Sequence, residues 1–234
     1  MDLDKLLNTI MTQYGDKLSG SRVFAEVMSK IERNKATYAD AYTLAREVGR
    51  SLTDILREHL PEVLVDGKLP KDIANATIKP SMIQACSDVT SNTAAIQLQL
   101  NERANIGIAA IEPEVNLDQI DGIISGITGD HDYLSVIETT VDGIENFFEG
   151  HVDDFVHDNA EFHMNAGLSP KIERTATGKC CSWCEALLGT YEYSKVRNTG
   201  NDVFRRHKNC HCLVLYNPGN GSKNRQNVHT REWT

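Results

Sequence analysis

The sequence predicts an α+β fold, in which a predominantly helical body precedes a small, zinc-stapled, β-containing module at the C-terminus. Apolar residues recur at intervals of three and four through most of residues 1–170, which is typical of amphipathic helices. Five of the six cysteines fall within residues 180–212. Residues 171–234 carry 11 Lys or Arg against 5 Asp or Glu, a net +6, whereas residues 1–170 carry 13 against 28, a net −15. We therefore divide the chain into a helical body, 1–170, and a basic Cys/His metal-binding module, 171–234.

The composition restricts the class of protein and the compartment in which it is made. The chain has 234 residues and 40% hydrophobic residues, which can supply a sizeable core. No run approaches the ~18 consecutive apolar residues of a membrane span, and the first residues, MDLDKLLNTIMTQYG, lack the features of a signal peptide. We expect synthesis in the cytosol and no membrane span. In a reducing compartment, clustered cysteines are more often metal ligands or catalytic groups than disulfides.

Three helices are expected in the first 60 residues. Their apolar stripes have the 3.6-residue period of a helix and cover residues 3–18, 23–31 and 38–60. Ser21 can cap the second helix, and Thr37 with Asp40 resembles a capping box for the third. Pro61 is expected to end the third helix.

The remainder of the body alternates connections with further helices. Residues 61–80 contain three prolines and the pair Asp66-Gly67, which indicates a turn or hairpin-like connection, with helix resuming after Pro80. Periodicity then predicts an extended segment at 105–116, a short helix at 117–127 and one or two helices at 132–166.

Several polar residues of the body suggest chemistry, but structural roles explain them better. His151, His157 and His163 are six residues apart, whereas two ligands on one helical face are three or four apart. We expect them to be surface or core histidines. The acid-rich segment 151–162 is expected to form a solvated helix face, and Cys86 is expected to be a buried small hydrophobe.

The C-terminal module contains five candidate metal ligands. Zinc binds four thiolate or imidazole ligands in a tetrahedron, and a C-x-x-C pair can supply two of them across a tight turn. Cys181 and Cys184 have this spacing, and His207, Cys210 and Cys212 supply the other candidates. We prefer the four cysteines, with His207 as the rival for the last position. The structural alternative is a set of free thiols or a disulfide.

The residues around these candidates have expected structural roles. Cys180 and His211 are expected to be neighbours of the site, and Trp183 is expected to cover the metal or to pack on Leu187. The stretch between the two clusters is long enough for a hairpin, with a small core from Tyr191, Tyr193, Val203 and Phe204. A surplus of candidate ligands favours a closed structural site over a catalytic one, which keeps a place for water.

These motifs resemble the C-terminal portion of phage minor head proteins of the Mu F-like head-morphogenesis family. The resemblance is carried by KCCSWCEALLGTYEY and by the R-H-x-x-C-x-C pattern in DVFRRHKNCHC. It extends through ATYADAYTLAREVGRSL, LVDGKLPKDIANATIKP, IGIAAIEPEVNLDQIDGII and NAEFHMNAGLSPKIER, so that it covers nearly the whole chain. These helical segments are similar to members from phages and prophages of Gram-positive bacteria.

The resemblance implies a structural component of the virion that is made in the host cytoplasm, and we expect this chain not to be an enzyme. Such proteins associate with the portal protein or the major capsid protein at the head interior, and they assist head assembly or DNA delivery. A basic module could also contact packaged DNA, because Lys and Arg release counterions from phosphate. The alternatives are a DNA-binding module and a metal-dependent nuclease or hydrolase that uses His207, His211, Asn220 and His229.

Overall fold

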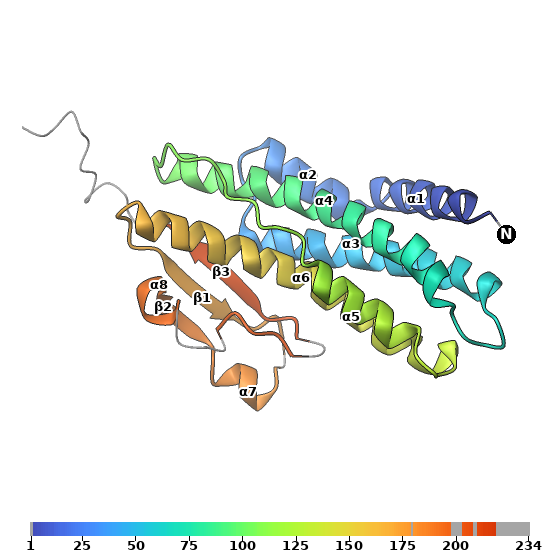
Figure 1. Cartoon of the computed structure of the whole chain (residues 1–234). Coiled ribbons are helices and arrows are strands. Elements are labelled where there is room, and N and C mark those ends of the chain that lie inside the picture. Colours follow the sequence, from blue (N-terminus) through green and yellow to red (C-terminus); the bar gives the residue numbers. More distant parts are fainter. Residues whose placement is uncertain (1, 179, 198–202, 208–209, 219–234) are drawn as a thin grey trace, which may run out of the picture.

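The computed structural model describes residues 2–178, 180–197, 203–207 and 210–218. The helices of the body are α1 (Leu3–Ser19), α2 (Arg22–Glu32), α3 (Tyr38–His59), the 3₁₀ turn η1 (Leu60–Val63), α4 (Lys71–Arg103), α5 (Leu117–Ile127) and α6 (Tyr133–Asn165). The C-terminal elements are β1 (Lys171–Thr175), α7 (Ser182–Glu185), β2 (Gly189–Glu192), α8 (Tyr193–Val196) and β3 (Leu213–Asn217). The fold is therefore mostly helical with one small sheet near the C-terminus, as predicted (Figure 1).

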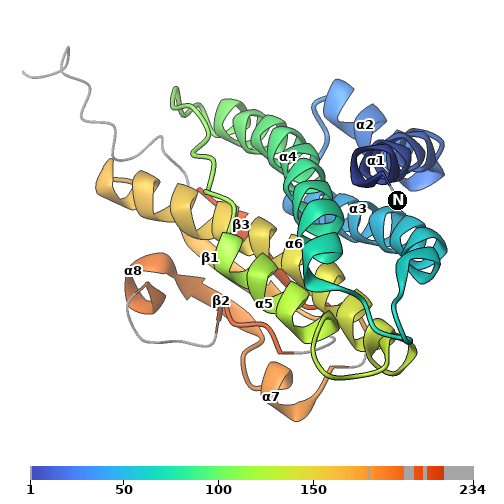
Figure 2. The same cartoon turned by 45° about the vertical axis from the view of Figure 1, so that its right-hand side comes forward.

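Helices α3 and α6 lie at the centre of the molecule. They pack against each other and against α4, while α1 and α2 contact α3 on one side. The sheet lies on the other side of α3 and α6, away from α1 (Figures 1 and 2). Its strands are antiparallel in the order β2-β1-β3, so the two outer strands do not pair as a hairpin with each other.

The helix starts follow the predicted caps. The backbone N–H of Phe24 donates to the hydroxyl of Ser21, 3.3 Å away, at the start of α2. At the start of α3 the backbone N–H of Thr37 donates to the carboxylate of Asp40 at 2.9 Å, which completes a capping box. These side chains satisfy backbone donors that have no partner within the helix.

The start of α4 differs from the prediction. The helix begins at Lys71 and runs through Pro80, so the expectation that helix resumes only after Pro80 is wrong. A proline within a helix removes one backbone hydrogen bond but has the φ of a helix. Ala74 and Ile78 before it and Met82 after it are fully buried, and their burial offsets this loss. The turn in front of α4 is as predicted, because Asp66 and Gly67 have positive φ between the paired residues Val65 and Lys68.

The sheet and the helical body share one hydrophobic core. The hydroxyl of Tyr42 on α3 donates to the carboxylate of Asp153 at 2.5 Å, accepts from the backbone N–H of Val214 at 3.3 Å and lies 3.1 Å from the carbonyl oxygen of the same residue. The ring of Tyr38 packs edge-to-face on Tyr216, with centroids 6.2 Å apart. The proposed boundary at residue 170 therefore lies between two parts that are in close contact.

The polar residues of α6 are more buried than expected. His151 and His163 are buried and His157 is half-buried, which agrees with their expected structural roles, and Cys86 is fully buried. The acid-rich segment is not a uniformly solvated face, because Asp153 is 3% exposed. Ion pairs with the C-terminal module make this burial possible. None of the helices in the described part of the chain combines the length and the apolar character that a membrane crossing requires.

Candidate metal centre

The five predicted ligands come together at one end of the sheet. Cys181 is the N-cap of α7, and Cys184 lies within this short helix (Figure 1). His207 lies in the segment before β3. Cys210 and Cys212 also precede β3, which begins at Leu213, so they belong to a loop and not to the strand.

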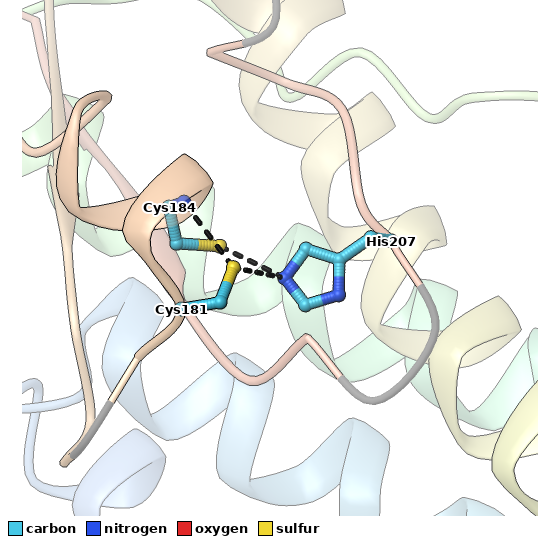
Figure 3. A group of neighbouring side chains, drawn as sticks. All are labelled: Cys181, Cys184 and His207. Atoms are coloured by element: carbon cyan, nitrogen blue, oxygen red, sulfur yellow. Dashed lines mark hydrogen bonds between the residues drawn. The ribbon is translucent and has the colours of Figure 1, made fainter.

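Cys181, Cys184 and His207 form the first of two donor groups (Figure 3). The Nε2 atom of His207 is 3.2 Å from the Sγ of Cys181 and 3.1 Å from the Sγ of Cys184. The backbone N–H of Cys184 also donates to the Sγ of Cys181 at 3.4 Å. This is the tight turn that a C-x-x-C pair needs to direct both sulfurs toward one point.

Cys184, Cys210 and Cys212 form the second donor group, and all three are buried. The Sγ atoms of Cys184 and Cys210 are 3.7 Å apart. Two sulfurs that share a tetrahedral zinc, with Zn–S bonds of about 2.3 Å, lie about 3.8 Å apart. Cys184 belongs to both groups, so it is the residue around which the two cysteine clusters of the sequence converge. The ligand atoms within each group lie within 4.8 Å of one another, and the arrangement can hold a metal ion.

A buried arginine faces these sulfurs. Arg174 on β1 is 2% exposed, and its NH2 group lies 3.7 Å from the Sγ of Cys184 and 3.6 Å from that of Cys210. The same guanidinium donates from NH1 to the backbone carbonyl of Arg205 at 3.0 Å. A cation here stabilises thiolates, the form in which cysteine binds metal. The sequence offered no signal for this role, because Arg174 belongs to neither cluster and carries no metal-ligand pattern.

The two cysteines of the C-x-x-C pair have different proton affinities. The hydrogen bond from the backbone N–H of Cys184 lowers the pKa of Cys181, which is exposed. Burial raises the pKa of Cys184 to about 12. A metal ion that binds Cys184 therefore displaces a proton from this thiol.

The residues predicted as neighbours line the same pocket. Its volume is about 490 Å³, and its lining includes Cys180, His211 and Thr177 together with Arg46 and Arg50 of α3. The ring of Trp183 packs edge-to-face on His207, with centroids 5.6 Å apart. The guanidinium carbon of Arg174 lies 5.5 Å from the centre of the Trp183 ring. Trp183 thus covers a ligand of the candidate site.

The remaining predictions concern the small core and the sulfurs. Tyr193 and Val203 are buried, and Tyr191 and Phe204 pack partly buried against the main core. All six cysteines are free thiols, so the structure contains no disulfide and does not support that alternative. Asn220, His229 and Trp233 lie outside the described residues.

Comparison with protein-family models, with curated proteins and with solved structures gives no match. A proposal of function therefore rests on two observations, the geometry of the described residues and the resemblance of the sequence motifs.

Proposed function

We propose that the Cys/His cluster binds one zinc ion that has a structural role. Thiolates and imidazole are soft and borderline donors that suit zinc, and the number of protein donors exceeds the four that a tetrahedral ion takes. A site filled by protein ligands has no place for a reactive water. The observation that carries this proposal is the convergence of both cysteine clusters on Cys184.

The geometry favours His207 as one of the four ligands. Its Nε2 atom is within 3.2 Å of both sulfurs of the C-x-x-C pair. Cys210, whose sulfur is 3.7 Å from that of Cys184, completes the set that we propose: Cys181, Cys184, His207 and Cys210. Cys212 is then a buried thiol beside the ion and the alternative fourth ligand.

Elemental analysis of the full chain, purified without chelator, tests the zinc centre. We expect about one zinc per chain, and we expect Co²⁺ substitution to give the absorption bands of a tetrahedral site with thiolate ligands. In this experiment His207→Ala weakens binding more than Cys212→Ser if the proposed set is right. A metal-free chain whose sheet is nevertheless folded would contradict the proposal.

We further propose that the protein is a minor head component of a phage, of the Mu F-like head-morphogenesis family, and that it binds the portal protein or the major capsid protein. Its location would then be the head interior. The support is the resemblance of the motifs, which extends over nearly the whole chain. A zinc-stapled sheet that packs directly on a helical body also suits a protein whose role is assembly.

Co-expression with the portal protein encoded in the same genome tests this second proposal. We expect the two proteins to co-purify and to remain together through size-exclusion chromatography. The major capsid protein should be tested in parallel, and an unrelated phage portal protein serves as the control. Absence of binding to both partners, with a folded and zinc-loaded chain, would contradict the proposed role.

The pocket beside the cluster supports one alternative, a metal-dependent nuclease. Arg50, with a side chain that is 62% exposed, and His211 line this pocket and could contact a phosphodiester. The alternative predicts cleavage of DNA or RNA by the metal-loaded chain and its loss in His207→Ala and His211→Ala. The structural proposal predicts no turnover by any of these chains.

A further inference from the structure

Two buried carboxylates of the helical body face the segment that carries the candidate metal ligands. Glu149 is 0% exposed and Asp153 is 3% exposed, and both lie on α6. Burial of a carboxylate is costly unless it is paired and hydrogen-bonded. Burial raises the pKa of Asp153 above its usual value, and the charge of Arg206 offsets part of this rise. The residues that pair with these two carboxylates therefore indicate what the carboxylates do.

The first partner is Arg206, the residue directly before His207. Its Nε donates to Asp153, its NH2 donates to the same carboxylate at 3.0 Å, and its NH1 donates to Glu149 at 3.0 Å. The two remaining N–H groups donate to the backbone carbonyls of Cys210 and Cys212, both at 3.0 Å. A guanidinium has five N–H donors, and here all five are used. The Arg206 side chain is thus fixed between α6 and residues 210–212, which we call the ligand loop.

The second partner is Arg46 on α3. Its Nε donates to Glu149, and its NH2 donates to the backbone carbonyl of His211 at 2.9 Å. Glu149 therefore accepts from two arginines that both bind backbone carbonyls of residues 210–212, directly before β3. The ring of Tyr42 lies under Arg206, 5.1 Å from its guanidinium carbon, and shields this network from water.

We propose that Glu149 and Asp153 are positioning residues of the metal centre, which they orient through Arg206 and Arg46. This inference rests on the zinc site proposed above. The backbone carbonyls of three successive residues, Cys210, His211 and Cys212, are held by these arginines. Their orientation sets the direction of the Cys210 sulfur toward Cys184. The helical body and the C-terminal module then form one composite metal site.

Two physical effects follow from this arrangement. Partners beyond the ligands fix the orientation of a metal site, and their loss typically costs about 10- to 100-fold in metal affinity. Linkage is reciprocal, so metal binding must also strengthen the contact between α6 and the loop. Neither effect is expected if the carboxylates serve the stability of the helical body alone.

Metal affinity of full-length variants tests the proposal. Zinc competition against a chromophoric chelator is measured for Asp153→Asn, Glu149→Gln and Arg206→Lys. In Asp153→Asn an amide N–H replaces an acceptor opposite the guanidinium, and in Arg206→Lys the planar fork is lost although the charge is kept. We expect each to bind zinc about 10- to 100-fold more weakly than the wild type.

Asp158→Asn is the matched control. It is the same change on the same helix, at a half-exposed residue whose carboxylate pairs with His157. We expect its zinc affinity to equal that of the wild type. If Asp153→Asn and Glu149→Gln also keep the wild-type affinity, the positioning role is wrong while the zinc site stands. A wild type that binds no zinc overturns both proposals.

Hydrogen exchange of the wild type decides the question even if a variant does not fold. The amide of Val214, which donates to the hydroxyl of Tyr42, and the amides of α6 around residues 149–156 are followed with and without zinc. We expect removal of zinc to accelerate exchange at Val214 and at residues 149–156, with no change in α1. Acceleration confined to residues 180–212 would overturn the composite site.

Discussion

Cys184 shows how one side chain can determine a whole site. It is the single residue common to the two donor groups, and it is buried while its partner Cys181 is exposed. The spacing of the cysteines predicted that both belong to the site. It did not predict that Cys184 is buried while Cys181 is exposed, because burial comes from tertiary contacts, here those of Cys184 with Arg174 and Cys210.

Substitution of Cys184 is therefore expected to have the largest effect of any cysteine change. Cys184→Ser removes a ligand from both groups, and we expect loss of stoichiometric zinc and a less stable sheet. Cys180→Ser, in the same pocket but outside both groups, is the control and should keep the metal. Metal content per folded chain is the measurement. Equal zinc content in the two variants would contradict the assignment of Cys184.

Two buried histidines make the fold sensitive to acid. Burial lowers the pKa of His151 and of His163 from 6.5 to about 4. Between these values the unfolded chain binds a proton that the folded chain does not, so stability is full above pH 6.5 and falls as the pH falls.

Each of these histidines should cost about 2 kcal/mol of stability between about pH 7 and pH 5. Urea denaturation at the two pH values measures this loss. His163→Gln should flatten the pH dependence, whereas His157→Gln should not, because hydrogen bonding to Asp158 raises the pKa of His157. A pH dependence that is unchanged in His163→Gln would show that His163 does not contribute.

At the scale of elements, an asparagine on α6 holds the extended segment between α4 and α5. The side chain of Asn159 accepts from the backbone N–H of Ile111 at 2.9 Å and donates to its carbonyl at 2.8 Å. An extended segment at 105–116 was predicted, and the structure has no helix or strand there. Asn159 therefore replaces the backbone partners that a sheet would provide.

Asn159→Ala should leave both backbone groups of Ile111 without this partner. Each unsatisfied buried group costs about 1–3 kcal/mol, and because Ile111 is only half-buried we expect the lower part of the sum, a loss of about 2–4 kcal/mol in the free energy of unfolding. Asn165→Ala, at the exposed end of the same helix, is the control and should change stability by less than about 0.5 kcal/mol. Chemical denaturation of the two variants makes the comparison. A small effect in both would mean that water replaces the Asn159 amide.

At the scale of the whole molecule, the proposed zinc site and the helical core would stabilise different parts of one structure. Helices α1, α3, α4 and α6 bury a continuous apolar core without any contribution from Cys184, Cys210 and Cys212, which form a separate cluster. Strands β1 and β3 pack on this core through Ile172, Val214 and Tyr216, whereas α7 contributes no residue to it. A bound metal would replace the core that the segment around α7 lacks.

Removal of zinc should therefore loosen the sheet and leave most of the helix intact. At free zinc about 1,000-fold above Kd, binding contributes about 4 kcal/mol, which corresponds to roughly 10 °C in Tm for a chain of this size. Chelation should lower Tm accordingly with little change in helical circular dichroism, and zinc, but not magnesium, should restore it. An unchanged Tm after complete removal of zinc would contradict a structural role.

The amino-acid sequence by itself determined the helical body, its caps and the Cys/His residues of the candidate metal centre. Helical periodicity, capping pairs and the C-x-x-C spacing are local properties, and they act over a few residues. Only the tertiary structure decided that Pro80 lies within a helix, that Asp153 is buried and that Arg174 and Arg206 hold the ligand loop. These outcomes depend on contacts between residues far apart in the chain, where packing and charge pairing override local preference.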